Sequence, residues 1–248
     1  RLDLLLLEHA RESGVDIFQN TPLKRLQRHP NGWLLESDAG VFESRELVAA
    51  DGRNSTVLRQ LGLMPPPFAE ERIAAQTHLS SPPDLGNDVI LRFVAQGYAG
   101  IAPVGENRAN LCLVCRPRDL TAIQSWAAEQ FNLHSDQQWR TITPLRRAPL
   151  SPTAPKLWLA GDTARVVEPF TGEGIAYALR SGALCAEALL LSRPERYNQT
   201  HAALYKGRLW VNQLARWACL NPRGGTAFVH AGQLFPQLFK LLTAKVVR

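Results

Sequence analysis

Glycines and an aspartate within LWLAGDTARVVEPFTGEGIAYALRSG (Leu157–Gly182) have the types and spacing to hold a flat ring and a hydroxylated chain. Gly161 and Asp162 follow a short apolar run typical of a buried strand, and ligands of open α/β sheets bind beyond the carboxyl ends of such strands. A carboxylate there can accept hydrogen bonds from sugar-like hydroxyls, and the glycine lets a ligand pass close to the backbone. Taken alone, this pair also suits an ordinary turn whose Asp side chain bonds its own backbone.

The residues from Pro169 to Gly174 extend the same chemistry to the start of a long helical pattern. Thr171 is expected to cap that helix, and Gly172 and Gly174 lack side chains, so a flat ring can approach the backbone. The free N–H groups and the dipole of a helix start favour negative charge, such as that on the pyrimidine edge of a reduced flavin. A glycine-containing helix start without a ligand is the alternative. The predicted flavin-contacting residues of this segment are Gly161, Asp162, Pro169, Thr171, Gly172, Gly174 and Ile175.

A second junction between a strand and a helix occurs in AADGRNSTVLR (Ala49–Arg59), where Asp51 and Gly52 follow an apolar run. Asp51 is predicted to organise the loop on the phosphate side of a nucleotide through hydrogen bonds to the backbone. Asp-Gly is also a common turn, so this pair is a weak indication by itself.

Hydrophobic periodicity and turn residues predict the elements that position these motifs. Predicted helices are Leu2–Ser13, Ser55–Leu61 with Ser55 as N-cap, Leu120–Phe131, Gly174–Leu191, and a tail from Glu195 interrupted at Asn221-Pro222 and Gly224-Gly225. Predicted strands are Val15–Phe18, Leu23–Gln27, Trp33–Ser37, Val41–Glu43, Glu46–Ala50, Ile73–Leu79, Val89–Ala95, Tyr98–Pro103, Asn110–Cys115, Thr141–Ala148 and Leu157–Ala160. The residues expected on the sheet-facing side of the long helix are Ile175, Ala178, Leu179, Gly182, Ala186 and Leu189.

Two proline-rich stretches, Met64–Phe68 and Ser151–Pro155, divide the chain because helices cannot cross them. The predicted fold class is α/β (α+β), with a discontinuous nucleotide-binding domain, an inserted and mostly antiparallel β-sheet substrate lobe, and a C-terminal helical region. We expect ligands where the two lobes meet. The predicted bounds are 1–63 and 156–192 for the nucleotide-binding domain, 64–155 for the substrate lobe and 193–248 for the helical region.

Charge is unevenly distributed along the 248 residues. The net charge is +6, yet residues 196–248 hold eight Lys and Arg and no Asp or Glu. Basic and aromatic residues at helical spacing suit a membrane surface or nucleic acid, or else a helical cap with its aromatic residues inward. We favour the cap, keep peripheral membrane contact as the alternative and expect no nucleic acid partner. The aromatic residues are Tyr197, Tyr205, Trp210, Trp217, Phe228, Phe235 and Phe239.

Composition narrows the class of protein further. With 45% hydrophobic residues the chain can build a sizeable core, and no apolar run approaches the roughly 20 residues that span a bilayer. Cys112 and Cys115 form a CxxC, but they lie in the alternating strand pattern ANLCLVCR, where residues three apart face opposite sides. We therefore expect core cysteines and no metal site. Four cysteines in all fit a reducing, cytoplasmic location.

These motifs together carry a resemblance to a known family. ADGRNSTVLRQLG resembles the Asp-Gly motif, and AGDTARVVEPFTGEGIAYALRSG the Gly-Asp motif, of the para-hydroxybenzoate hydroxylase superfamily of flavoproteins. The wording Pro-Phe-Thr-Gly-Glu-Gly-Ile is most similar to its geranylgeranyl reductase-like branch. The segments from Gly97 to Gly105 and RLDLLLLEHARESGVDI are also similar to that branch, so the resemblance covers most of residues 1–192.

The resemblance implies a FAD site in a Rossmann-like domain. It implies that Asp162 binds the ribityl chain, that Gly172 and Gly174 lie against the isoalloxazine, and that Asp51 and Gly52 support the pyrophosphate region. It also implies two further FAD contacts, through Arg1 and through the backbone of Leu23 near the adenine.

The chain departs from the family pattern in two places. It contains no G-x-G-x-x-G, the loop that cradles the pyrophosphate at a helix start, and we expect about a hundred residues that bear this loop to precede Arg1. We therefore expect this chain to bind FAD weakly or not at all by itself. Arg165 stands where the family usually has a small residue, and it is expected either to contact phosphate or to reach solvent.

The implied function is a FAD-dependent oxidoreductase that takes hydride from NADH or NADPH and reduces an unsaturated, prenyl-type or lipid-like small molecule. The alternatives are a FAD-dependent monooxygenase acting on an aromatic substrate and a non-catalytic fragment. A halogenase is disfavoured because no Trp-x-Trp-x-Ile-Pro segment occurs. Glu173, His78 and Arg92 are candidates for acid–base chemistry by location alone, and a structural or surface role is the stronger hypothesis for each.

Overall fold

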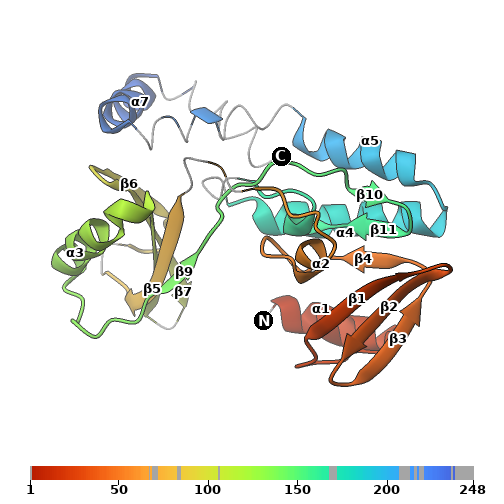
Figure 1. The fold of residues 1–248 in the computed structure, drawn as a ribbon. Coiled ribbons are helices and arrows are strands. Elements are labelled where there is room, and N and C mark those ends of the chain that lie inside the picture. Colours follow the sequence, from red (N-terminus) through yellow and green to blue (C-terminus); the bar gives the residue numbers. More distant parts are fainter. Residues whose placement is uncertain are drawn as a thin grey trace.

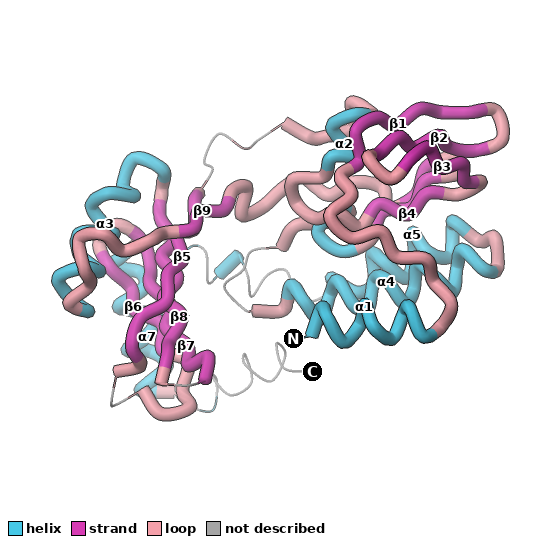
Figure 2. Tube along the Cα trace, turned by 90° about the horizontal axis from the view of Figure 1, so that it is seen from below, coloured by secondary structure: helices cyan, strands magenta, loops and turns pink. Residues whose placement is uncertain are grey.

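The structure is a computed structural model, which describes residues 2–66, 68, 72–82, 85–105, 107–167, 172–206, 213–214, 217, 221–235 and 237. Two groups of elements stand apart in Figures 1 and 2: a sheet flanked by helices, and a mixed group that carries both motifs. We call them the sheet lobe and the motif lobe.

The motif lobe begins with helix α1 (Leu2–Glu12) and a three-stranded antiparallel meander of β1 (Leu23–His29), β2 (Gly32–Ser37) and β3 (Gly40–Ser44). A second sheet has the order β10-β11-β4, formed by Thr153–Ala154, Leu157–Leu159 and Leu47–Ala49. Strands β4 and β11 run parallel, although they lie more than a hundred residues apart in sequence. The remaining helices are α2 (Thr56–Gln60), α4 (Gly174–Leu190) and α5 (Pro194–Tyr205), besides the short 3₁₀ turn Gly161–Thr163.

One hydrophobic core joins the meander to the parallel strands. Trp33 of β2 is buried there, and its indole Nε1 donates a hydrogen bond of 2.6 Å to the carbonyl oxygen of Lys156. Leu58 of α2 is fully buried in the same core beside Leu157 and Leu159. The two segments of the chain are thus held together by apolar burial, the main driving force for folding.

The sheet lobe is a five-stranded antiparallel sheet of order β6-β7-β8-β5-β9, made of Ile90–Val94, Gly97–Gly105, Arg108–Cys115, Ile73–Ser80 and Arg140–Ile142. Helix α3 (Leu120–Phe131), preceded by the 3₁₀ turn Pro117–Asp119, covers one face through its fully buried Ile123 and Ala127. The other face carries Tyr98 and Val114, on which Leu145 from the chain after β9 packs.

The structure confirms the mixed α/β class with an antiparallel sheet, and most of the predicted elements within a residue or two. Ser55 caps α2 as expected, with its Oγ accepting the N–H of Leu58 at 3.0 Å. Cys112 and Cys115 lie on opposite faces of β8, and burial raises the pKa of both thiols. The Rossmann-like character of the motif lobe and the bounds of the three domains stay predictions.

Three predicted elements were wrong. Residues 15–18 form no strand, because the described chain offers them no neighbouring strand, and Phe18 instead packs on the ring of Phe42. The strand predicted over Thr141–Ala148 ends at Ile142, since Pro144 has no N–H to continue the ladder. Gly224-Gly225 does not interrupt the tail: both glycines lie within α7 (Pro222–Leu234), a helix near β6.

The predicted buried face of α4 was also wrong. Ile175 and Leu179 are exposed, and the side chains that the helix buries are Tyr177, Ser181, Cys185 and Ala188. The reason is the neighbouring helix α5, whose aromatic side chains pack on this face: Tyr177 stacks on Tyr205 with 4.7 Å between ring centroids. Small residues at helical spacing predicted close packing, but the larger rings decide which face is covered.

Candidate functional site

The two predicted motifs meet at one edge of the motif lobe. Because β4 and β11 are parallel neighbours, the loops that follow them leave the sheet at the same edge. The N–H of Gly52 donates a hydrogen bond of 2.8 Å to Oγ1 of Thr163, and the same hydroxyl lies 3.3 Å from Oδ1 of Asp51. The structure therefore brings Asp51 and Gly52 together with the Gly161–Asp162 loop.

Asp51 organises its loop through the backbone, as predicted from the sequence. Its Oδ2 accepts the N–H groups of Thr56 and Val57 at 2.7 and 3.1 Å, while Ser55 takes the next one at Leu58. These side chains satisfy the amides at the start of α2, which would otherwise lack partners. The carboxylate is thus committed to shaping the loop.

Asp162 is paired with an arginine of the other motif. Nη2 of Arg53 lies 2.8 Å from Oδ2 of Asp162, and the two side chains are 20% and 28% exposed. The pair is partly screened by solvent, and a carboxylate can accept further hydrogen bonds on its second oxygen. Asp162 can therefore accept hydrogen bonds from hydroxyl groups while Arg53 fixes its orientation.

Gly161 fits its loop against α4 in a way that other residues would disturb. Its φ of +59° lies in the left-handed region, and an added Cβ would come 3.3 Å from Cβ of Ala178. Its N–H donates a hydrogen bond of 2.8 Å to Oγ of the buried Ser181. The glycine therefore allows a tight approach of the loop to the helix.

At the start of α4, Gly172 has a φ of +70°, and an added Cβ at Gly172 or Gly174 would meet no atom of the described residues within 4 Å. The residue in the cap position is Glu173, which makes no capping hydrogen bond with its side chain, and Thr171, which was predicted to cap the helix, lies outside the described residues. Backbone N–H groups at such a helix start can donate hydrogen bonds to a ligand with negative charge.

The other predicted contacts have mixed outcomes. Ile175 lies in the first turn of α4 with 66% of its surface exposed, next to these glycines. Leu23 begins β1 and packs at the edge of the motif-lobe core, so its predicted contact with adenine stays a prediction. Arg1, Pro169 and Thr171 lie outside the described residues.

Arg165 is half-buried against an aromatic ring, and its expected contact with phosphate stays a prediction. Its guanidinium lies 4.6 Å from the ring centroid of Tyr205, which is buried and stacks on Tyr177. Beside them His201 is buried, and burial together with the charge of Arg165 lowers the pKa of its imidazole to about 4. Burial likewise raises the pKa of Tyr205 to about 12. This aromatic cluster anchors the loop after Asp162 to α5.

The acid–base candidates lie in three different places. Glu173 accepts a hydrogen bond of 3.2 Å from the hydroxyl of Tyr177. His78 is exposed on β5, and the guanidinium of Arg92 on β6 lies 5.8 Å from the ring centroid of Phe131. The structure does not bring these three side chains together.

Sequence reasoning missed three members of the site: Arg53, Arg147 and Thr163. Arg53 and Thr163 directly follow the two motifs, so their place in the sequence could have identified them as members of the site. Arg147 lies between strands β9 and β10, and no local pattern singled it out. Its guanidinium is buried beneath both loops.

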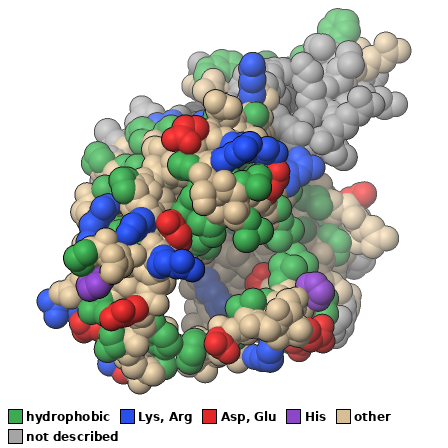
Figure 3. Space-filling view, turned by 90° about the vertical axis from the view of Figure 1, so that its right-hand side faces the viewer, with side chains coloured by type: hydrophobic (Ala, Val, Ile, Leu, Met, Phe, Trp, Pro, Cys, Tyr) green, Lys and Arg blue, Asp and Glu red, His purple; other side chains and the backbone are tan. Residues whose placement is uncertain are grey.

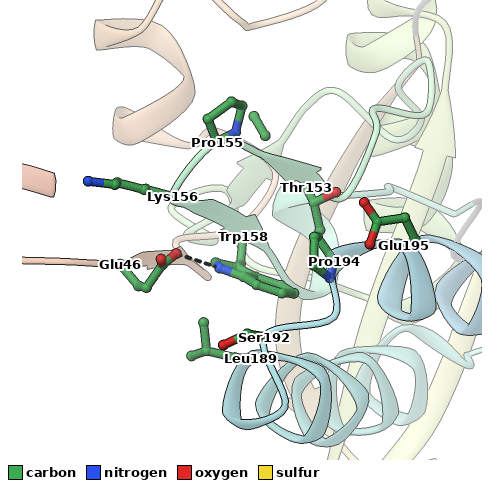
Figure 4. A pocket seen from close by; sticks show the side chains of 10 residues that line it. Glu46, Thr153, Pro155, Lys156, Trp158, Leu189, Ser192, Pro194 and Glu195 are labelled. Carbon is green, nitrogen blue, oxygen red and sulfur yellow. Dashed lines mark hydrogen bonds between the residues drawn. The ribbon is translucent and has the colours of Figure 1, made fainter. Parts of the chain in front are cut away.

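A groove with a volume of about 540 Å³ lies elsewhere in the motif lobe (Figure 4). Glu46 and Lys156 line it just before β4 and β11, whereas the motif residues follow these strands, so the groove lies at the opposite edge of the sheet. Its floor is the indole of Trp158, whose Nε1 donates a hydrogen bond of 2.9 Å to Glu46. Because the motif residues lie away from this groove, we place the candidate site at the two motif loops. Figure 3 shows charged side chains of both signs scattered among hydrophobic ones on one face of the molecule.

No family model matches the chain. Among curated proteins, it is similar to the menaquinone reductase of Mycolicibacterium smegmatis, with 29% identity over 173 residues that cover 61% of this chain and 42% of that protein. It is also similar to the digeranylgeranylglycerophospholipid reductase of Thermoplasma volcanium, with 25% identity over 75% of this chain and 52% of that protein. The 3-demethoxyubiquinol 3-hydroxylase of Escherichia coli is 24% identical over 68% of this chain and 46% of that protein.

The resemblance to geranylgeranyl reductase-like flavoproteins is confirmed. The chain spans about half the length of these curated relatives. Among solved structures, it is similar to a triple mutant of the flavin-dependent brominase Bmp2, with a TM-score of 0.76 and 16% identity over 100% of this chain and 70% of that one. It is also similar to PqsL of Pseudomonas aeruginosa, a probable FAD-dependent monooxygenase by its description, with a TM-score of 0.71 and 18% identity over 91% and 71% of the two chains. At this identity the structural likeness establishes the fold alone.

Proposed function

We propose that this chain carries the ribityl and isoalloxazine side of the FAD site of a FAD-dependent oxidoreductase. The observation that carries the proposal is the meeting of the Asp51-Gly52 and Gly161-Asp162 loops beyond the parallel strands, next to the start of α4. When bound, FAD would supply the hydride-transfer chemistry, and the protein would supply orientation and electrostatics.

Each residue has a role that its surroundings allow. Asp162, oriented by Arg53, would accept hydrogen bonds from ribityl hydroxyls. The bare backbone at Gly172 and Gly174 leaves room for a flat ring, and the N-terminal end of α4 would stabilise negative charge on its pyrimidine edge. Asp51 would keep the neighbouring loop in shape without contacting the ring.

The proposed reaction is the reduction of an unsaturated, prenyl-type or lipid-like substrate with NADH or NADPH as the electron donor. Two of the relatives are named reductases of menaquinone and of a digeranylgeranyl phospholipid, which supports this class.

A FAD-dependent monooxygenase is the second candidate. The relative named 3-demethoxyubiquinol 3-hydroxylase favours it, and one flavin site can serve both reactions. A non-catalytic fragment is the remaining alternative, because a complete FAD site also needs a loop that holds the pyrophosphate.

We infer that a segment bearing the G-x-G-x-x-G loop completes the site. Helix α1 buries none of its side chains, and its apolar residues Leu2, Leu4, Leu5 and Leu6 are 45–62% exposed. Strand β4, at the end of its sheet, pairs only with β11 among the described residues. A complementary segment that packs on α1 and pairs with β4 would bury both surfaces.

We propose that the protein is cytoplasmic and that its C-terminal region contacts a membrane surface peripherally. Trp217, Leu234 and Phe235 are exposed there, while Tyr197 and Tyr205 are buried in the motif lobe. Among the described residues, the structure has no helix long and apolar enough to cross a membrane.

Flavin-reduction kinetics on the full-length protein test the proposed function. We expect NADH or NADPH to reduce the bound flavin and a prenyl substrate to reoxidise it without oxygen. Reoxidation that requires oxygen and yields a hydroxylated product would favour the monooxygenase. A full-length protein that binds no FAD would contradict both enzymes, and stoichiometric FAD on the isolated 248-residue chain would contradict the need for a completing segment.

A further inference from the structure

Arg147 lies where the chain crosses from the sheet lobe to the motif lobe. It follows β9 by five residues, in a segment that Figure 1 shows running between the two lobes. Two residues earlier, Leu145 is buried on the face of the sheet lobe with Tyr98 and Val114. One short stretch of chain therefore touches the sheet lobe and, through Arg147, the motif loops.

The guanidinium of Arg147 holds both motif loops by their backbone. Nη1 donates a hydrogen bond of 3.0 Å to the carbonyl oxygen of Arg53, in the Asp51-Gly52 loop. Nη2 donates a hydrogen bond of 2.7 Å to the carbonyl oxygen of Asp162 and another to that of Thr163, in the second loop. One planar group thus bridges two loops that lie more than a hundred residues apart in sequence.

The Asp51-Gly52 loop also reaches back to the crossing segment. Nη1 of Arg53 donates a hydrogen bond of 3.2 Å to the carbonyl oxygen of Pro144, and Nδ2 of Asn54 donates one of 3.1 Å to that of Thr143. Residues 143–147 therefore form the support of this loop, and Arg147 extends that support to the Asp162 loop.

The geometry depends on the shape of arginine as well as on its charge. Residue 147 is only 5% exposed, and its partners are three carbonyl oxygens and, at 3.5 Å, Sδ of Met64, with no paired carboxylate among the hydrogen-bond partners that the described residues provide. Burial lowers the pKa of Arg147, while the nearby charges of Asp162 and Asp51 act in the opposite direction. A guanidinium presents five N–H donors in a fixed plane, whereas a lysine ammonium is a compact point charge that cannot span the same three oxygens.

We propose that Arg147 is a positioning residue, which sets Asp162 and Gly52 at the separation that the flavin requires and couples them to the sheet lobe. This inference rests on the proposed function. Arg147 holds the backbone of both partners of the Arg53–Asp162 ion pair, so its loss displaces the carboxylate that would receive the ribityl chain.

The test uses the full-length protein with Arg147→Lys and Arg147→Gln, and with Arg146→Lys and Arg146→Gln as matched controls. Arg146 is the adjacent arginine, and its guanidinium lies 4.0 Å from the ring centroid of Phe68. Two readouts are measured: the Kd for FAD, and the hydrogen-exchange rate of the Gly52 N–H, whose bond to Thr163 joins the two loops. The N–H groups of α2 that Asp51 holds serve as the internal reference.

We expect the Kd for FAD to rise about 10- to 100-fold in both Arg147 variants, the range for losing one hydrogen bond to a charged group. Exchange at Gly52 is expected to quicken about tenfold while the reference amides and both Arg146 variants stay unchanged. Arg147→Lys keeps the charge and most of the volume, so it tests the geometry even if Arg147→Gln unfolds.

Two results would overturn the inference. One is an unchanged Kd in both Arg147 variants, including the case in which only the melting temperature falls, because that is the mark of a purely structural arginine. The other is an unchanged exchange rate at Gly52. If the unmodified protein binds no FAD, the proposed function fails, and the exchange rate at Gly52 still decides whether Arg147 positions the loops.

Discussion

Replacing Asp162 by Asn removes one negative charge from the proposed ribityl contact and keeps the shape of the side chain. A hydrogen bond to a charged group contributes about 1.5–3 kcal/mol, so we expect the Kd for FAD to rise about 10- to 100-fold. The effect on folding is smaller, because the side chains of Asp162 and Arg53 are 28% and 20% exposed and such partly solvated pairs contribute about 0–1 kcal/mol. Affinity is therefore expected to change more than stability.

The assay is a titration of the flavin-free full-length protein with FAD, followed by flavin fluorescence, with thermal melts of both forms in parallel. Asp38→Asn is the matched control, since Asp38 is also an aspartate paired with a cation, Lys24, but on the exposed meander. We expect its Kd to equal that of the unmodified protein. An unchanged Kd in Asp162→Asn would refute the assignment of this carboxylate, and so would a loss of stability large enough to account for the weaker binding.

Three further predictions concern the surroundings of the site. Gly161→Ala should lower the melting temperature by several degrees, because a left-handed φ costs an alanine roughly 1–2 kcal/mol and its Cβ would press on Ala178; a melt at the level of the unmodified protein would contradict the described loop. Arg165→Ala should destabilise the fold by about 0.5–2 kcal/mol in urea unfolding, since it removes the cation–π contact with Tyr205, whereas Arg165→Lys should retain part of it. The pKa of His201 is about 4 in the folded chain, below its ordinary value, so the neutral form is favoured by folding. Stability should therefore fall as the pH drops from about 6.5 towards 4. Replacing His201 by Phe should make the free energy of unfolding depend less on pH in that range. An unaltered pH dependence would show that another group titrates.

The motifs could be located from sequence because each combines an apolar strand, a turn and a helix start. Both strands are apolar, and they bury most of their residues by pairing in parallel with each other. This pairing brings Asp51 next to Thr163. The N-cap at Ser55 was equally accessible, since a hydroxyl residue before an apolar helical pattern is a local feature.

Long-range packing accounts for what the sequence did not reveal. The buried face of α4 is chosen by the stacking of Tyr177 on Tyr205, a contact that periodicity within the helix cannot show. Arg147 shares no local pattern with the motifs, and its role depends on the path of the chain between the lobes. Gly224 and Gly225 continue a helix despite their low propensity, because propensity is a weak preference that context overrides.

An experimental structure of the full-length protein with FAD bound tests the central claim most directly. We predict a ribityl hydroxyl within hydrogen-bonding distance of the Asp162 carboxylate, about 2.6–3.2 Å, and the pyrimidine edge of the ring at the start of α4 beside Gly172 and Gly174. A flavin bound in the groove over Trp158, or anywhere else away from the two motif loops, would contradict it.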